Sequence, residues 1–348
     1  MSSFVGDRRC FSLLAVLGIF WILYASPVAA DQILRYAEFG PNRGMREPLQ
    51  RWLADEIHQR SQGQLVLRTS FGGSLIGARN VLRGVSAGVA DLGTIVAAYT
   101  PAQFERYRVT DLPVGDDDPW VGLRAAYDLA TGEAEIVEEF RREGVLYLSN
   151  LSSTTLILAC RFPVTEVEDF QGLRMRAVPP HDQVFRSLGA VVVGLPIPEV
   201  YQALDRELID CTQTYWLSVL AYRHFEPAPE LTELHWSQNL AYSMIMSRKT
   251  YEGLAARHQA SIRRLGEEAI DYVARLAIEE QHRARTTAQQ QPSVTVHQLS
   301  QPARQRLRAD GEKLVDAYPG NRRLFESFKA RVQAHRKVLD ARGYPWEE

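Results

Sequence analysis

Residues 170–216 read FQGLRMRAVPPHDQVFRSLGAVVVGLPIPEVYQALDRELIDCTQTYW, and this stretch is the most informative part of the chain. Side chains alternate in polarity over 173–178, which predicts a short strand with Arg174 and Arg176 on one face. Pro179 lacks the backbone N–H that a central ladder requires, so the strand must end there. Arg176 is therefore expected at the carboxyl end of this strand.

Arg176 is the first candidate for a ligand-binding residue. In open α/β sheets, ligands bind in the crevice outside the carboxyl ends of the strands. A planar guanidinium can donate two parallel hydrogen bonds to a carboxylate, so the position suits an organic acid. The alternative is an ordinary salt bridge, since most arginines lie on surfaces. We assign that structural role to Arg174, which lies two residues earlier.

The flanking sequence predicts alternating strands and helices. A strand over 33–37, a helix over 45–61 and a strand over 65–69 make a β–α–β opening, and a further strand follows over 92–96. This alternation predicts α/β lobes with mostly parallel sheets. The ~318 residues that follow position 30 suggest two lobes, at roughly 150 residues per domain.

A long helix is expected over 249–291, where the pattern is helical almost without interruption and proline is absent before Pro292. A coiled coil is the alternative for so long a helix, but the apolar positions keep no strict heptad. A break at 289–293, a short strand over 294–296 and helices to Ala341 complete the chain.

Several short motifs lie before, within and after the predicted strand. They are Phe-Gly-Gly at 71–73, Gly-Val-Ala-Asp at 88–91, Gly-Leu-Arg-Met-Arg at 172–176, Leu-Gly-Ala at 188–190, Glu-Val-Tyr-Gln-Ala-Leu at 199–204 and Ile-Asp at 209–210. In this order and spacing, the motifs resemble those of the solute-binding proteins of TRAP transporters, the DctP-type periplasmic receptors for organic acids. The resemblance spans nearly all of the chain after its N-terminal segment.

The resemblance implies a two-lobed periplasmic binding protein, a type II-like clamshell with a long helix linking both lobes. The expected segments are 31–153 plus 240–279 for lobe I, and 154–239 plus 280–348 for lobe II and the C-terminal helices. The lobes would cross near 150–155 and 236–241, and these crossings would form the hinge. A small carboxylate would bind in the interlobe cleft and be delivered to the small and large membrane subunits of the transporter. We expect a monomer with no cofactor.

This chain departs from the family pattern at two informative places. The family usually has Gly-x-x-Asp-Gly-x-Glu where this chain has Glu-Leu-Ile-Asp-Cys-Thr-Gln at 207–213, so Gln213 replaces a carboxylate near the pocket. Relatives that bind sialic acid carry a second arginine on the preceding strand, and the corresponding residue here is Leu156. Sialic acid is therefore not the expected ligand.

Further candidate ligand residues follow the strands that face the expected cleft. Tyr215 and Trp216 could form aromatic walls, with core packing as an equal alternative, and Gln213 and Thr214 could hydrogen-bond the ligand. We assign Asp210 to loop structure, because a carboxylate would repel an acid. In the resembled family, pocket positions correspond to Glu38, Phe39 and Tyr99. Gln238 and Asn239 lie in the second crossing, where exposed polarity would explain them equally well.

The first thirty residues have the pattern of an export signal. Arg8 and Arg9 precede an apolar run over 11–25, and Val-Ala-Ala at 28–30 precedes Asp31. We expect cleavage near Ala30 and a periplasmic protein, with both the Sec and Tat routes open and an uncleaved anchor as the alternative. Removal of this segment takes away two arginines and one aspartate, so the formal charge moves from −2 to −3. This near balance gives no reason to expect nucleic-acid binding.

An oxidising compartment would permit a disulfide between Cys160 and Cys211, but we favour two reduced, buried cysteines. The acidic run 116–118 could attract a hard cation, although a solvated turn is the simpler interpretation and no metal site is predicted. Nucleophile-elbow, phosphate-loop and zinc-protease motifs are absent, so we do not expect an enzyme. An exported ligand sensor and an exported hydrolase of small acids remain alternatives.

Overall fold

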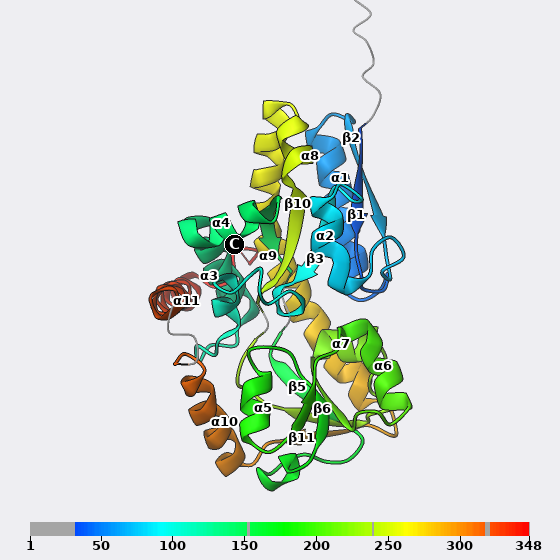
Figure 1. Ribbon diagram of the computed structural model, residues 1–348, viewed down its shortest axis with the longest axis vertical. Helices are drawn as coiled ribbons and strands as arrows, with labels where there is room; N and C mark the ends of the chain where they lie inside the picture. Colours follow the sequence, from blue (N-terminus) through cyan, green and yellow to red (C-terminus); the bar gives the residue numbers. More distant parts are fainter. Residues whose placement is uncertain (1–31, 152–153, 239, 317–320, 348) are drawn as a thin grey trace, which may run out of the picture.

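The computed structural model describes residues 32–151, 154–238, 240–316 and 321–347, and it has two β-sheets in two lobes (Figure 1). The expected signal peptide lies outside the described residues. Within them, no helix has the length and apolar character needed to cross a bilayer.

The first sheet has the order β2-β1-β3-β10-β4. Its strands are β1 (Gln32–Ala37), β2 (Leu65–Ser70), β3 (Leu92–Val96), β4 (Val145–Asn150) and β10 (Tyr242–Ser247). Each residue of β3 and β10 is buried, as expected for strands covered on both faces. Its helices are α1 (Arg46–Arg60), α2 (Val81–Ser86), α3 (Pro119–Gly132), α4 (Ala134–Arg142) and α8 (Arg248–Gly253).

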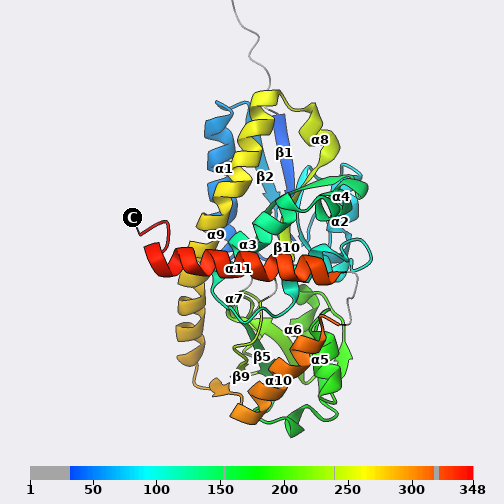
Figure 2. The same cartoon turned by 90° about the vertical axis from the view of Figure 1, so that its left-hand side faces the viewer.

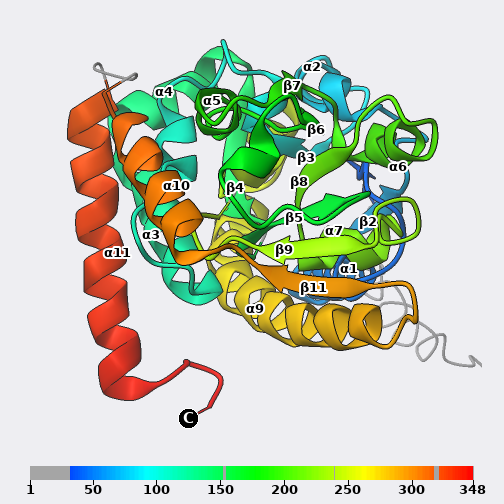
Figure 3. The ribbon, with the colours of Figure 1, turned by 90° about the horizontal axis from the view of Figure 1, so that it is seen from below.

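The second sheet has the order β11-β9-β5-β8-β6-β7. Its strands are β5 (Leu156–Cys160), β6 (Arg174–Arg176), β7 (Val191–Val193), β8 (Cys211–Tyr215), β9 (Glu230–Glu233) and β11 (Thr295–Gln298). The accompanying helices are α5 (Asp182–Ser187), α6 (Ile197–Asp205), α7 (Trp216–Ala221) and α10 (Gln301–Lys313), and Figure 3 shows this sheet from below. Together the two sheets confirm the expected two-lobed α/β fold.

The expectation of mostly parallel sheets is confirmed, although each sheet contains one strand that runs against the others. β10 runs antiparallel to β3 and β4, and β5 runs antiparallel to β8 and β9. The opposing strands β5 and β10 are the first strands after the chain has passed from one sheet to the other, and each enters its new sheet from the opposite end. The parallel pairs are those of the β–α–β units, such as β1 with β2 and β6 with β7.

Helix α9 (Ala256–Gln289) runs along both lobes, where it packs on β4 and α1 of the first lobe and on α7 of the second (Figure 2). Gly266 permits the close approach to β4, since a Cβ there would lie 2.3 Å from the carbonyl oxygen of Leu148. The uninterrupted helix expected over 249–291 is instead divided, because Leu254 and Ala255 are extended between α8 and α9.

Helix α11 (Arg322–Arg342) packs across α3 of the first lobe, and α10 packs on α5 of the second (Figure 2). The guanidinium of Arg336 on α11 donates to both oxygens of Asp116, at 2.6 and 2.8 Å. Asp118 caps α3 by accepting from the backbone N–H of Val121 at 3.0 Å. The acidic run 116–118 therefore organises helix ends, and the described residues contain no cluster of potential metal ligands.

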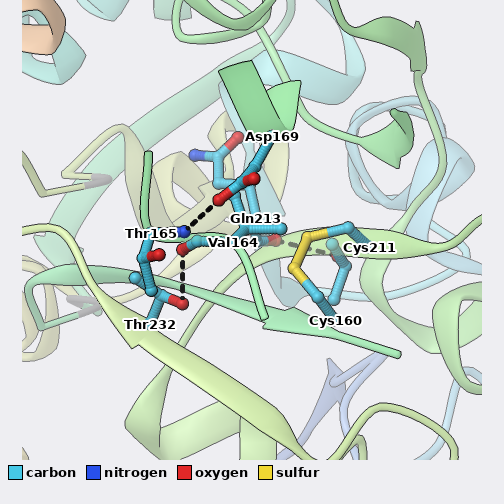
Figure 4. The surroundings of a disulfide bond; sticks show 8 residues. Cys160, Val164, Thr165, Asp169, Cys211, Gln213 and Thr232 are labelled. Atoms are coloured by element: carbon cyan, nitrogen blue, oxygen red, sulfur yellow. Dashed lines mark hydrogen bonds between the residues drawn. A yellow bond between two sulfur atoms is a disulfide. The ribbon is translucent and has the colours of Figure 1, made fainter. Parts of the chain in front are cut away.

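Cys160 and Cys211 form a disulfide, contrary to the expectation of reduced cysteines (Figure 4). The reason is the antiparallel pairing of β5 with β8, which sets the two residues directly opposite each other with their Cα atoms 4.0 Å apart. The bond joins β5 to the strand that carries Gln213, two residues beyond Cys211.

Candidate functional site

Arg176 ends β6, as the sequence predicts, and its side chain is buried between the lobes, with 4% of the residue exposed. Its Nε donates to the carbonyl of Leu195 at 2.8 Å and its Nη1 to that of Gln213 at 2.9 Å. Its Nη2 lies 3.5 Å from the hydroxyl of Tyr99, which comes from the first lobe. The same hydroxyl accepts from the backbone N–H of Ile197 at 2.9 Å, so Tyr99 bridges the two lobes.

All three partners of Arg176 are uncharged. A guanidinium has five N–H donors, and three contacts leave two of them on the terminal nitrogens. Within the described part of the chain, no carboxylate lies in ion-pair distance of this side chain, whereas Arg174 on the same strand pairs with Asp210 at 2.6 and 2.7 Å. A buried cation without a counter-charge is costly, so the site is suited to an anion. The structural roles assigned to Arg174 and Asp210 are confirmed.

Gln213 is buried on β8 and holds the neighbourhood of Arg176 in place. Its side-chain oxygen accepts from the backbone N–H of Val178 at 3.1 Å, and its amide nitrogen lies 3.0 Å from Nδ1 of His181. Nε2 of His181 lies 2.8 Å from the carbonyl of Asp111 in the first lobe. These contacts fix the tautomer: Nε2 donates to Asp111, and Nδ1 accepts from Gln213. Gln213 thus connects Arg176 to the first lobe.

Burial lowers the pKa of His181 to about 4, against a smaller opposite effect of the hydrogen bond to Asp111. The folded-state pKa is thus below the unfolded one, so the stability contributed by neutral His181 is complete above about pH 6.5 and is lost as the pH falls toward 4. We expect the difference in unfolding free energy between wild type and His181→Gln to shrink between pH 7.5 and pH 4.5. Urea unfolding at both pH values measures it, and an unchanged difference would contradict the neutral network.

The first lobe contributes an arginine that the sequence analysis did not identify. Arg46 begins α1 and is 7% exposed. Its Nη2 donates to the hydroxyl of Tyr242 at 3.1 Å, and its guanidinium carbon lies 5.5 Å from the ring centre of Tyr222 in the second lobe. Its Nε lies 3.5 Å from a carboxylate oxygen of Glu38. No local motif marks this residue, because its partners come from distant parts of the chain.

Glu38 is the only acidic residue among the described residues that line the small cavity beside Arg46. Leu151, Tyr215 and Tyr242 also line that cavity. Phe39 connects it to the other arginine, because its ring centre lies 6.0 Å from that of Tyr242 and 6.2 Å from that of Tyr99. Of the predicted site residues, the structure therefore brings Arg176, Gln213, Tyr99, Phe39, Glu38 and Tyr215 together.

The other predicted site residues have different surroundings. The indole N–H of Trp216 donates to Glu233 at 3.2 Å, and Trp216 lines a separate cavity beside α9. The side chain of Gln238 donates to the carbonyl of Asp118 at 3.1 Å, next to α3. The hydroxyl of Thr214 lies 3.5 Å from Nδ1 of His224, and Asn239 lies outside the described residues.

A groove of about 640 Å³ lies elsewhere, between α10, α11 and the loop 113–117. Charges of both signs line it, among them Asp116, Arg308, Glu312 and Lys329, and Asp116 and Asp316 are already paired with arginines. Neither Arg176 nor its partners line this groove. Charge and hydrogen bonding, rather than cavity volume, therefore identify the small cavity beside Arg46, together with the nearby side chains of Tyr99 and Arg176, as the candidate ligand site.

Residues 45–321 match the family model of DctP, the bacterial extracellular solute-binding protein family 7. The chain belongs to this family. A solute-binding protein of Sulfitobacter sp. (strain NAS-14.1) is 26% identical over 256 residues, which are 72% of this chain and 76% of that relative. The C4-dicarboxylate-binding periplasmic protein DctP of Rhodobacter capsulatus is 24% identical over 213 residues, 60% of this chain and 62% of the relative, which is less than two thirds of its length.

Solved structures have the same fold. The sugar acid binding protein of Advenella mimigardefordensis, in complex with galactonate, has a TM-score of 0.79 at 16% identity and covers 87% of this chain and 98% of its own. A TRAP periplasmic solute-binding protein of Bordetella bronchiseptica, with bound mandelate, has a TM-score of 0.78 at 20% identity. The match covers 87% of this chain and 99% of that protein's chain. The prediction of a DctP-type solute-binding protein is thereby confirmed, and so is its two-lobed fold.

Proposed function

We propose that this protein captures a small organic acid between its two lobes and that Arg176 binds the carboxylate. The observation that carries the proposal is the buried guanidinium at the carboxyl end of β6, whose three contacts are all with uncharged groups. Relatives of the same family bind galactonate and mandelate, which are both carboxylic acids, and this supports the same class of ligand here.

The receptor would act in the periplasm and deliver its acid to the two membrane subunits of a TRAP transporter. Family membership supports both statements, and the sequence pattern of 1–30 supports the periplasmic location. Delivery requires that the membrane subunits distinguish the ligand-bound form of the receptor from the ligand-free form. Tyr99, which contacts Arg176 and Ile197 across the cleft, supports closure upon binding, because these contacts can form only when the lobes meet. The crossings at 151–155 and 234–241 would serve as the hinge, and the lobe boundaries follow from them.

A thermal-shift screen of the mature protein tests the ligand class. The panel would contain monocarboxylates, dicarboxylates, sugar acids, aromatic acids and keto acids, with the matching neutral amides and alcohols as controls. An acid present at a hundred times its dissociation constant should add about 2.7 kcal/mol of stability. Stabilisation by neutral compounds alone, or turnover of a bound acid detected by mass spectrometry, would contradict the proposal.

A further inference from the structure

We propose that the cleft selects acids with a single carboxylate and an uncharged polar end, and that the Glu38–Arg46 ion pair excludes a second carboxylate. This inference rests on the proposed function and narrows its ligand class. It follows from the charges that the described residues bring to the two ends of the cleft.

At one end, Arg176 is a buried cation whose contacts are with uncharged groups. At the other end, the buried cation of Arg46 already has a counter-charge, because Glu38 lies 3.5 Å from its Nε and is 1% exposed. A buried carboxylate and guanidinium at this separation largely neutralise each other. One positive charge is therefore left for the ligand, and it lies on Arg176.

Glu38 cannot easily move out of the way of a second carboxylate. Its Oε1 accepts from the backbone N–H of Gly40 at 2.7 Å, and its Oε2 accepts from the hydroxyl of Thr94 at 2.7 Å. Thr94 in turn lies 2.8 Å from the hydroxyl of Tyr36. These two hydrogen bonds anchor the carboxylate of Glu38 at the first-lobe end of the cleft, where a second carboxylate would lie beside it.

The other titratable groups around the cleft add no charge near pH 7. Burial lowers the pKa of His181 to about 4 and that of His224 to about 3, so both rings are neutral. Burial raises the pKa of the Tyr99, Tyr222 and Tyr242 phenols, which therefore stay protonated.

The first-lobe end nevertheless offers polar groups for an uncharged ligand. Among the described residues at this end, Nε of Arg46 and the hydroxyl of Tyr222, whose ring lies beside Arg46, are buried without a hydrogen-bond partner. Leaving such groups unpaired is unfavourable, and ligand hydroxyls could pair with them without bringing charge beside Glu38. A hydroxylated monocarboxylic acid fits both ends, whereas a dicarboxylate would place its second charge against Glu38.

Matched acid pairs provide the test: galactonate with galactarate, and gluconate with glucarate. Within each pair, the second member has an additional carboxylate at the far end. We expect wild type to bind the monocarboxylate at least tenfold more tightly by calorimetry at pH 7.5 and fixed ionic strength. The variant Glu38→Gln keeps an acceptor for Gly40 but removes the charge, and we expect it to reduce this preference at least tenfold.

Glu139→Gln is the matched control. Glu139 is a buried first-lobe carboxylate that accepts from the backbone N–H groups of Arg106 and Tyr107, and it does not line the cavity beside Arg46. This variant should keep the wild-type preference. If dicarboxylates bind wild type as tightly as the matching monocarboxylates, the inference is overturned and the proposed function still stands. The same conclusion follows if Glu38→Gln is folded and keeps the wild-type preference. Failure of every acid to bind would overturn both.

Discussion

Arg176→Lys is expected to weaken binding of the acid ten- to hundred-fold, although the positive charge is kept. A lysine ammonium cannot form the planar two-bond contact with a carboxylate, and it cannot at the same time satisfy the carbonyls of Leu195 and Gln213. Loss of one charge-assisted hydrogen bond in a closed cleft costs roughly 1.5–3 kcal/mol, which corresponds to this range of affinity. Calorimetry with the best acid from the screen measures the effect.

Arg174→Lys is the matched control for this substitution. Arg174 lies on the same strand, but its guanidinium is half exposed and paired with Asp210. The control variant should bind the acid as wild type does, because an exposed ion pair contributes little. If Arg176→Lys and wild type bind the acid with equal affinity, and circular dichroism shows that both are folded, the carboxylate does not bind at Arg176.

Loss of the disulfide is expected to have the largest effect on stability. The bond between Cys160 and Cys211 closes a loop with a sequence separation of 51 residues, and the chain-entropy model assigns such a loop about 4 kcal/mol. The variant Cys160→Ala/Cys211→Ala should therefore unfold at a clearly lower urea concentration than the oxidised wild type. Equilibrium unfolding followed by fluorescence measures the difference.

Reductant supplies the control for the disulfide prediction. The urea midpoint of wild type treated with a phosphine reductant should approach that of the double variant. The midpoint of the double variant itself should not change with reductant. If thiol titration shows that both cysteines are free and the wild-type midpoint has not moved, the bond contributes nothing to stability and the prediction is wrong.

The position of Arg176 could be predicted because local rules determine it. Alternation fixes which face of the strand it occupies, and Pro179 fixes where the strand ends, so no distant residue is needed. The long helix was predicted equally well over 256–289, while the extended residues Leu254 and Ala255 have no strong local signal such as proline. Patterns of this kind show that an element exists, but not which other elements it packs against.

Arg46 could not be predicted for the opposite reason. It begins a helix of low amphipathic contrast, and its contacts are with Tyr222 and Tyr242, which lie more than 170 positions later in the chain. The surroundings of Trp216 could not be predicted from its neighbours either. Tyr215 ends β8 and Trp216 begins α7, so the two adjacent side chains point to different places. Tyr215 lines the cavity beside Arg46, whereas the indole of Trp216 donates to Glu233.

The disulfide was missed because it depends on strand direction. Cys160 and Cys211 face each other because β5 pairs with β8 as the one antiparallel strand of its sheet, and the sequence alone does not supply the distance between the two cysteines. Strand direction across a crossing between lobes depends on the route of the whole chain, which a local pattern does not contain.

A crystal structure of the protein with its best-binding acid tests the central claim most directly. We predict that the carboxylate will lie against the terminal nitrogens of Arg176, at about 2.7–2.9 Å from each, with the uncharged end of the acid toward Arg46 and Glu38. An acid bound in the groove between α10 and α11, or in the cleft with its carboxylate away from Arg176, would contradict the account.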